Sequence, residues 1–364
     1  MDLFDGILSL TIWNVIMFAI AGTLIWLAVV KGYEPMLLLP IGFGAIMANI
    51  PLAAVEGLKP LEILRQAGIG TELFPLLIFT GVGAMIDFGP LLKNPKMLLF
   101  GGAAQFGIFF TLSFAVLMGF SLKEAAAIGI IGAADGPTSI FVANKFAEHL
   151  VGPITVAAYT YMALVPIIQP PVIRLLTTKE ERKIRMDYFE QPVSKKVKVL
   201  FPILVTFIAG IIAPNSVSLV GFLMFGNLLR ESGVTDRLSK AAQNELASVV
   251  TILLGITIGS TMTAESFLNL ETLMIISMGL IAFIFDSAGG IIFAKVLNLF
   301  SKNKINPMIG AAGISAFPMS ARVIQREAQL ADPTNFILMH AVSANVGGQI
   351  ASIVAGGLIL ALVG

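Results

Sequence analysis

One carboxylate stands alone inside a long apolar run of the sequence. Asp135 lies in the segment IGIIGAADGPTSIF, which contains no other charged residue. A lone carboxylate deep in a membrane costs about 2.5–3.5 kcal/mol, so neighbouring groups must compensate its charge. The Gly136-Pro137 pair that follows interrupts helical hydrogen bonding and frees backbone oxygens, and Thr138 and Ser139 add hydroxyl groups. One negative charge among hard oxygen ligands suits Na⁺ or H⁺.

A simpler role is open for this carboxylate and for one other. Asp135 could serve only as the N-cap of a helix half that starts near Thr138, a position that favours Asp. A capping Ser would do the same without burying a charge, which favours the ion site. Asp286, in FIFDSAGG, is the second intramembrane candidate. Its alternative role is a helix-end residue that faces a polar cavity.

Uncharged oxygen donors gather at two places in the last quarter of the chain. The stretch from Asn306 to Pro318 mixes a side-chain amide, small residues and the Ser315 hydroxyl at a helix break. The stretch from Asn345 to Gln349 interrupts the last apolar helix with further amides and two glycines. Taken singly, each of these residues more often serves helix packing than ion binding, because small-residue interfaces are common in membranes.

A cation and two phenols complete the set of candidate residues. Arg322 lies at the start of a helix half, where a guanidinium could hold a carboxylate bidentately or snorkel as an anchor at the cytoplasmic interface. Tyr159 and Tyr161 precede the Pro170-Pro171 pair, and interfacial anchoring is the simplest role for both.

The composition predicts the bilayer as the solvent of this chain. Of its 364 residues, 57% are hydrophobic and 12% are charged, and the mean hydropathy is +0.91. A net charge of +1 argues against nucleic acid as a partner. Cysteine is absent, and His149 and His340 are too few for a zinc site, so they are interpreted as polar residues near helix ends.

The elements that must position these residues are apolar runs of helical length. We expect six such elements in each half of the chain, with no large soluble domain between them. In the first half they lie at roughly 8–31, 36–54, 73–92, 97–119, 123–150 and 153–175. In the second half they lie at roughly 197–213, 216–230, 246–265, 271–295, 305–329 and 334–363. The elements at 123–150 and 305–329 are interrupted by Gly136-Pro137 and by Gly313 to Pro318. If each enters and leaves on one side as a re-entrant hairpin, five crossings per half remain.

An internal repeat supports this division. Three ordered matches share an offset near 178 residues: Gly42–Asn49 with Gly221–Asn227, Thr80–Met85 with Ile258–Met262, and Gly132–Gly136 with Gly310–Ile314. Five crossings per half would make the repeat inverted. We therefore expect an all-α polytopic membrane protein in which two broken, re-entrant hairpins meet near the midplane, as in inverted-repeat transporters.

Charge distribution predicts the orientation. Residues 1–175 form the first membrane repeat, 176–198 a cytoplasmic linker and 199–364 the second repeat, because the polar stretch from Arg174 to Lys198 carries a basic excess. Asp2 and Asp5 before the first helix, with Lys31 after it, predict an N-terminus outside. Most other basic side chains then fall on the cytoplasmic side, and four do not, namely Lys59, Arg65, Lys123 and Lys145.

Four long motifs resemble a known family. They are GAADGPTSI at 132–140, AYTYMALVPIIQPP at 158–171, NPMIGAAGISAFPMSARV at 306–323 and NVGGQIAS at 345–352. Together they closely resemble the β subunit of the sodium-pumping biotin-dependent decarboxylases, the family that serves oxaloacetate, methylmalonyl-CoA, glutaconyl-CoA and malonate decarboxylase complexes. The resemblance covers essentially the whole chain. The chain is similar to the more compact members of the family, which favours an acyl-CoA decarboxylase complex over an oxaloacetate decarboxylase complex.

The resemblance implies a function and a set of site residues. Such a β subunit decarboxylates carboxybiotin carried by a partner, takes up a proton and couples this to Na⁺ export. Carried over position by position, the family's functional residues fall on Asp135 for Na⁺ and coupling, on Arg322 for carboxybiotin and on Tyr161, and its neutral Na⁺ positions fall on Asn306, Gly310, Ser315 and Asn345. These motifs assign no role to Asp286.

The resemblance also implies partners and a location. The chain has no biotin-attachment motif and no soluble carboxyltransferase domain, so it needs a biotin-carrier protein and a carboxyltransferase (α) subunit. A small membrane-anchor (γ or δ) subunit, a homo-oligomer and a place in the bacterial inner membrane are expected with them. Two rival functions stay open on the residues alone: a secondary transporter, as a Na⁺/H⁺ antiporter or Na⁺-solute symporter, and a structural membrane anchor.

Overall fold

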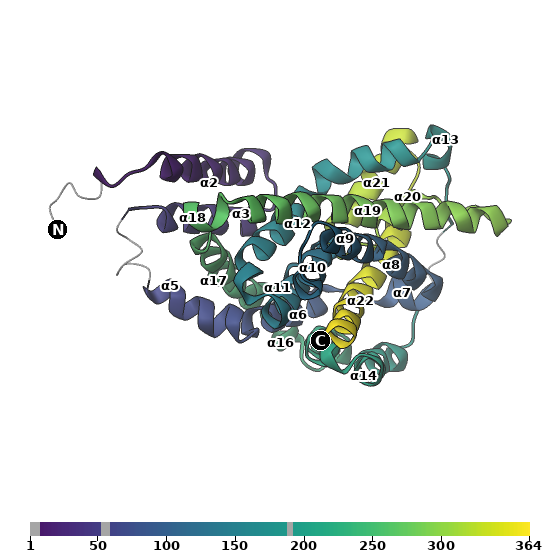
Figure 1. Cartoon of the computed structure of the whole chain (residues 1–364). Helices are drawn as coiled ribbons and strands as arrows, with labels where there is room; N and C mark the ends of the chain where they lie inside the picture. Colours follow the sequence, from purple (N-terminus) through teal and green to yellow (C-terminus); the bar gives the residue numbers. More distant parts are fainter. Residues whose placement is uncertain (1–7, 52–58, 188–191) are drawn as a thin grey trace.

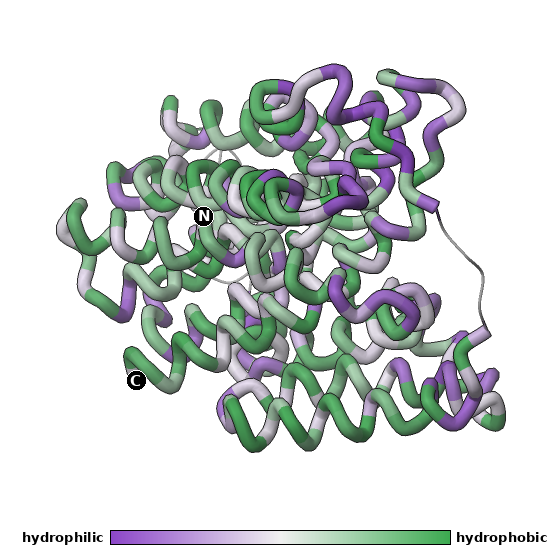
Figure 2. The backbone as a smooth tube through the Cα atoms, turned by 90° about the vertical axis from the view of Figure 1, so that its right-hand side faces the viewer, coloured by the Kyte–Doolittle hydropathy of each residue, from purple (hydrophilic) through white to green (hydrophobic). Residues whose placement is uncertain are grey.

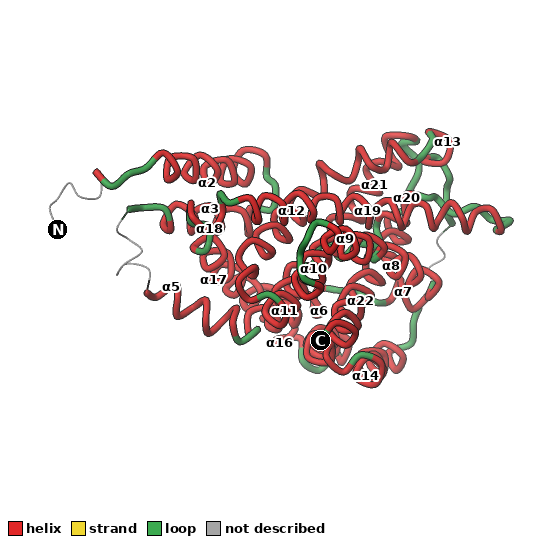
Figure 3. Tube along the Cα trace, in the orientation of Figure 1, coloured by secondary structure: helices red, strands yellow, loops and turns green. Residues whose placement is uncertain are grey.

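The computed structural model describes residues 8–51, 59–187 and 192–364 (Figure 1). These residues form helices and connecting loops, and no strand occurs among them (Figure 3). Six helical runs are long and apolar enough to cross a membrane: Ile12–Lys31, Pro95–Leu117, Glu148–Leu176, Asp236–Ser260, Leu270–Phe300 and Leu338–Val363. The prediction of an all-α multi-pass membrane protein is therefore confirmed. The predicted place of the N-terminus depends on Asp2 and Asp5, which lie outside the described residues.

Apolar side chains cover the outside of the helices. Trp13, Phe207 and Ile211 are each more than half exposed, although a protein dissolved in water would bury them. Figure 2 shows apolar residues along the helices and polar residues mostly at helix ends and in turns. This surface fits a lipid environment.

Local sequence signals explain where helices begin and end. Helix α2 (Ile12–Lys31) begins after Thr11, whose hydroxyl accepts the Asn14 amide, and ends at Gly32, whose φ of +68° suits glycine. Helix α10 (Leu122–Gly129) begins after Ser121 with a capping box to Glu124. The other short elements are α7 (Gly89–Lys93), η2 (Pro95–Met97), η4 (Glu148–Leu150), η5 (Pro214–Ser216), α16 (Asp236–Ala241), η6 (Ala242–Leu246) and α18 (Ala264–Phe267).

One bent pair of helices has a first arm that was not among the predicted elements, whereas its second arm matches the element expected at 73–92. Helix α5 (Lys59–Leu64) continues as η1 (Arg65–Gly70) and then bends by 62° into α6 (Leu73–Met85). Three charged residues interrupt the run from Lys59 to Gly70, so it does not stand out as an apolar segment. Two of them, Glu62 and Arg65, form an ion pair of 2.7 Å on its surface.

Both elements predicted to be broken are interrupted in the structure. The first runs through α10 and η3 (Ile130–Ala133), turns at Ala134 with φ +52°, and resumes as α11 (Gly136–Phe146). The second comprises α20 (Met308–Ala311) and α21 (Met319–Ala331), with a non-helical segment between them. Each break leaves backbone groups without helical partners, which frees them to bind other groups.

The first and second halves pack against each other through two similar crossings. Helix α3 (Pro35–Ala48) packs on α17 (Ala247–Ser260), and α15 (Val217–Ser232) packs on α6. At the end of the first crossing Asn49 donates to the Met262 carbonyl at 2.7 Å. At the end of the second, Asn227 donates to the Ile86 carbonyl at 2.9 Å. An asparagine amide thus holds a helix terminus of the opposite half at each crossing.

Helix α19 (Leu270–Phe300) runs along much of the molecule (Figure 1) and packs on α12 (Val151–Leu176) and on α20. Its contact with α20 is backbone on backbone, because a Cβ built at Gly290 would lie 2.0 Å from the Gly310 oxygen. On another face it meets α8 (Leu98–Ala104) and α9 (Phe106–Leu117), which are separated at Gln105. The C-terminal helix α22 (Leu338–Val363) packs on α8 and α21.

The linker between the halves is tied to the second half by side chains. It contains α13 (Lys179–Arg182) and leads to α14 (Lys195–Ile212). Arg185 pairs with Asp332 at 2.7 Å, and Glu181 pairs with Lys295 at 3.2 Å. Asn335 donates to the backbone carbonyls of the same linker segment at 3.2 Å. The segment is therefore a docked part of the structure.

Candidate functional site

Asp135 lies at the break of the first interrupted element and is 4% exposed. Its side chain accepts the Thr138 amide at 3.4 Å and the Thr138 hydroxyl at 2.7 Å. Gly136 and Pro137 form the first turn of α11, where proline needs no amide hydrogen and glycine leaves room for the ring of Tyr159. Asp135 therefore does cap α11, and its second carboxylate oxygen also faces groups outside that helix.

Those groups come from the second half of the chain. Ser352, on α22, donates to the Asp135 carboxylate at 3.2 Å, and the Ser315 hydroxyl hydrogen-bonds to Ser352. The Ser315 amide also donates to the Ala133 carbonyl at 3.0 Å, which joins the two broken elements directly. Ser352 was not assigned a role from the sequence, although it ends the motif NVGGQIAS; nothing in its local sequence separates it from the packing serines of that helix.

Two amides of α22 hold the second break. Asn345 donates to the Ile314 carbonyl at 2.6 Å, and Gln349 donates to the Ser315 carbonyl. The Asn345 side-chain oxygen is buried and has no hydrogen-bond partner among the described residues. Because buried acceptors normally have partners, this oxygen is suited to a cation or to a donor that moves into place.

Two of the other predicted Na⁺ positions have different neighbours. Asn306 donates to the carbonyls of Arg182 and Ile184 at 3.0 and 2.9 Å, so its amide holds the linker. Gly310 lies against Gly290 of α19. Neither hydrogen-bonds to Asp135. The structure therefore brings Ser315 and Asn345 to the joined breaks, and it gives Asn306 and Gly310 contacts that position α20.

The two tyrosines of α12 point to different surroundings. The Tyr161 hydroxyl donates to the Ile276 carbonyl of α19 at 2.5 Å. The Tyr159 ring packs against Gly136, and its buried hydroxyl has no partner among the described residues. Tyr159 rather than Tyr161 therefore lies beside Asp135, and its only sequence-based interpretation had been as an interfacial anchor.

A cavity of about 190 Å³ adjoins this site. Its lining includes Asp135, Tyr159 and Gln349, from the first break, α12 and α22. Residues of α3, α6 and α17 also line it, as does Glu34 in the turn before α3. A water occupies ~30 Å³ in the liquid, so the cavity has room for a partly hydrated cation.

Arg322 lies on the first turns of α21 and is exposed. It makes no ion pair in the part of the chain that the structure describes, so its guanidinium is available to an incoming anion. Burial raises the pKa of the Glu34 carboxyl, and the charge of Arg322 is near enough to oppose part of this rise. The guanidinium and the cavity edge are therefore electrostatically linked.

Asp286 is buried in the middle of α19, so its alternative as a helix-end residue was wrong. One carboxylate oxygen accepts the Ile108 amide at 3.1 Å, at the start of α9. The other lies against Gly132 and has no hydrogen-bond partner among the described residues. Asp286 therefore serves the break between α8 and α9, a distant pairing that no local pattern reveals.

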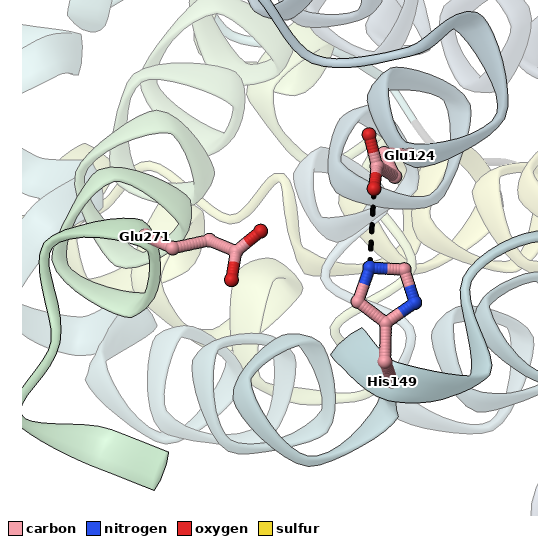
Figure 4. Close-up of side chains that lie close together, drawn as sticks. All are labelled: Glu124, His149 and Glu271. Carbon is pink, nitrogen blue, oxygen red and sulfur yellow. Dashed lines mark hydrogen bonds and ion pairs between the residues drawn. The ribbon is translucent and has the colours of Figure 1, made fainter. Parts of the chain in front are cut away.

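A second cavity and a polar cluster lie at the N-terminal end of α12, and neither includes Asp135. The cavity, of about 610 Å³, is lined by Arg65, Thr155 and Thr261 among others. In the cluster His149 contacts Glu124 at 3.1 Å, and Glu271 points toward this pair (Figure 4). His149 and His340 both lie near helix ends, as predicted.

Comparison with known proteins agrees with the motifs. The family described as "Na+-transporting oxaloacetate decarboxylase beta subunit" matches residues 13–363. The chain is 54% identical to the glutaconyl-CoA decarboxylase subunit beta of Acidaminococcus fermentans, over 99% of this chain and 96% of the relative. It is 52% identical to the methylmalonyl-CoA decarboxylase subunit beta of Veillonella parvula, over 98% and 95%.

A third relative is more distant. The oxaloacetate decarboxylase beta chain 2 of Salmonella typhi is 44% identical, over 98% of this chain and 96% of the relative. Matches of this extent confirm the resemblance predicted from the four motifs. The chain belongs to the family of β subunits of Na⁺-transporting decarboxylases, and it is a decarboxylase subunit coupled to Na⁺ transport.

Proposed function

We propose that this chain binds Na⁺ and H⁺ alternately at Asp135, and that decarboxylation of carboxybiotin brought by a partner drives Na⁺ export from this site. The observation that carries the proposal is the meeting of the two broken elements, where the Ser315 amide donates to the Ala133 carbonyl. Beside this contact the buried Asp135 carboxylate accepts a hydrogen bond from Ser352 of α22. A buried charge of this kind needs a proton or a metal cation beside it.

The oxygens around Asp135 make up a suitable Na⁺ site. The carboxylate supplies one negative charge and accepts hydrogen bonds from the hydroxyls of Thr138 and Ser352. The Ser315 hydroxyl is bonded to Ser352. We assign the unpartnered Asn345 oxygen to the same site. In this proposal Asn306 and Gly310 contribute by placing α20, and Tyr161 by fixing α12 against α19.

The two similar crossings support an inverted repeat. Helix α3 of the first half packs on α17 of the second, and α15 of the second packs on α6 of the first, each with an asparagine at its end. Such reciprocal packing between the halves is expected where two halves of opposite orientation build one site near the midplane. The two re-entrant hairpins of this proposal are the interrupted elements that contain Asp135 and Ser315.

Arg322 is the proposed binding group for the carboxylate of carboxybiotin. An exposed guanidinium with no ion pair in the described residues can bind a carboxylate bidentately. The carboxylated cofactor supplies the CO₂ that leaves, and this chain's residues bind the anion and deliver the proton that replaces it. Moving Na⁺ against the membrane potential costs about 2.3 kcal/mol per charge per 100 mV, which this reaction must provide.

The names of the relatives support a proposal for the substrate class and the partners. The two with higher identity are named for glutaconyl-CoA and methylmalonyl-CoA, so we propose an acyl-CoA decarboxylase complex. Its other parts would be a biotin-carrier protein, a carboxyltransferase (α) subunit and a small membrane anchor, around a homo-oligomer of this chain. We place it in the bacterial inner membrane, with the linker in the cytoplasm and the N-terminus outside.

The test is the Asp135→Asn variant in the complete complex. Because about 3 kcal/mol of charge interaction is lost, Na⁺-dependent decarboxylation and ²²Na⁺ uptake into proteoliposomes should fall about a hundredfold or more. Asp286→Asn is the matched control, since it keeps an oxygen that can accept the Ile108 amide. Both variants should assemble. Sodium-stimulated turnover retained by Asp135→Asn would refute the proposal, and ion exchange by the isolated chain without biotin would favour a secondary transporter.

A further inference from the structure

Glu34 is a half-buried carboxylate in the cavity that reaches Asp135. It lies in the turn between α2 and α3, with a left-handed backbone (φ +35°). It occupies the N-cap position of α3, yet its side chain makes no capping hydrogen bond. The side chain is therefore free for another role.

Glu72 provides a comparison within the same molecule. It precedes α6 as Glu34 precedes α3, it also has a left-handed backbone (φ +65°), and it also makes no capping hydrogen bond. Glu72, however, forms an ion pair of 3.1 Å with Lys145. The Glu34 side chain has no hydrogen bond or ion pair to any residue that the structure describes. Of the two glutamates, the one that lines the Asp135 cavity is the one without a partner.

No Lys or Arg among the described residues forms an ion pair with Glu34, so its charge is incompletely compensated. Lys31 lies over the Trp26 ring, 5.3 Å from its centroid. Burial raises the pKa of the Glu34 carboxyl even though Arg322 acts to lower it. A small cation beside Glu34 would therefore be stabilising.

The cavity wall strengthens any such attraction. Most of its lining is apolar, for example Leu37, Phe79 and Phe317, and two carboxylates, Glu34 and Asp135, line it together. Walls of low dielectric focus the field of fixed charges and raise the local concentration of counter-ions. A cation in this cavity thus experiences two negative charges from different elements of the fold.

We propose that Glu34 is a second sodium-binding carboxylate, which holds incoming Na⁺ in this cavity before it reaches Asp135. The inference rests on the proposed function of Asp135 and adds the residue that loads it. Glu34 sets the affinity for Na⁺ on the entry side, whereas Asp135 is needed for every turnover.

Replacement of Glu34 separates these roles in the complete decarboxylase complex. We expect Glu34→Gln to raise the Na⁺ concentration for half-maximal decarboxylation roughly fivefold at constant ionic strength, with choline as the balancing ion. The rate at saturating Na⁺ should stay within roughly twofold, because Asp135 is intact. Glu34→Asp, which keeps the charge, should lie near the wild type. Copurification of the partner subunits checks assembly.

Glu72→Gln is the matched control, because it removes the same charge from the same backbone setting. It should leave the Na⁺ dependence unchanged. An unchanged half-saturating Na⁺ concentration in Glu34→Gln would overturn the inference, as would a fall in maximal rate alone, which indicates a structural role. Failure of the underlying proposal is recognised separately, by sodium-dependent turnover in Asp135→Asn.

A second measurement needs no variant. A hydrophobic carbodiimide modifies carboxyls in apolar surroundings, and mass spectrometry reports the modification of Glu34 in the wild-type complex. Na⁺ should slow modification of Glu34, and an equal concentration of K⁺ or choline should not. Equal modification in all three salts would also overturn the inference.

Discussion

At Asp135 the observed capping role is compatible with the proposed ion-binding role, although the sequence presented the two as alternatives. It accepts the Thr138 amide as the cap of α11, and its other oxygen accepts hydrogen bonds from the Thr138 and Ser352 hydroxyls. A cap is well placed for ion binding, because the free amides at a helix start hold the carboxylate in one orientation. The capping geometry therefore positions the charge that the proposed ion site needs.

Ser352 should tune the affinity of this site. Removal of its hydroxyl in Ser352→Ala takes one hydrogen bond from the buried carboxylate, a loss of about 1–3 kcal/mol. We expect the Na⁺ concentration for half-maximal decarboxylation to rise about fivefold or more. Na⁺ titration of the decarboxylation rate measures this.

Ser343→Ala is the control for that change. Ser343 is also buried on α22, but its hydroxyl donates to the Met339 carbonyl of its own helix. Its replacement should leave the Na⁺ dependence unchanged. Equal effects of the two substitutions would show that Ser352 acts through helix packing alone.

Of the residues around the candidate site, the charged Asp135 was easier to predict from the sequence than its uncharged neighbours. Asp135 was recognisable because a charge in an apolar run is costly. Ser352 and Tyr159 were not recognised, because a serine in a small-residue helix and a tyrosine near a helix end are common for packing reasons alone. Their proximity to Asp135 depends on contacts between segments 24 and 217 residues apart.

At the scale of elements, close backbone contact fixes the second broken element. Gly290 and Gly310 touch so closely that a Cβ on either would lie about 2 Å from the other's oxygen. Only glycine allows α19 and α20 to approach in this way. The position of the second break therefore depends on the absence of a side chain at both Gly290 and Gly310.

Gly310→Ala should displace α20 from α19. Overpacking of this kind costs about 1–3 kcal/mol, so we expect a lower thermal unfolding temperature of the purified chain together with reduced turnover. Gly102→Ala is the control, because a Cβ there meets nothing within 4 Å. A Gly310→Ala protein of wild-type stability but without activity would instead indicate that Gly310 acts directly at the ion site.

Most elements were predictable from apolar length, and the exceptions have a physical cause. Most long spans and both broken elements begin and end within a few residues of their predicted bounds, for example α12 at Val151–Leu176 against 153–175. The span Asp236–Ser260 is an exception, because it begins before the expected start at 246. The run from Lys59 to Gly70 was missed, because Lys59, Glu62 and Arg65 interrupt its apolar sequence. Hydropathy alone does not recognise a helix whose apolar residues are separated by charged ones.

At the scale of the whole molecule, the linker is attached to the second half by charge. Hydrogen bonds from Thr334 and Arg185 lower the pKa of Asp332 to about 2. Because this pKa lies below the usual value of ~3.9, the ionised Asp332 carboxylate makes its full contribution to stability above pH ~3.9. It is lost only as the pH falls through about 2, so the attachment should be constant over physiological pH.

Asp332→Asn should loosen the linker at pH 7. Arg185 loses its ion pair and becomes more accessible, so trypsin should cleave after Arg185 faster than in the wild type. Mass spectrometry of the fragments measures the rate. Glu180→Gln is the control, since Glu180 pairs with Lys183 inside the linker. Wild-type cleavage after Arg185 should not change between pH 6 and pH 8 beyond the enzyme's own pH dependence.

The cavity at Asp135 is lined by two groups of helices. Residues of α3, α6 and α17 line it together with the joined breaks, α12 and α22. In the proposed transport, a relative movement of these two groups would change the width of the cavity and leave every helix whole. Since the chain contains no cysteine, a pair of introduced thiols, one in each group of helices, would carry spin labels without background. The distance between those labels would report this movement.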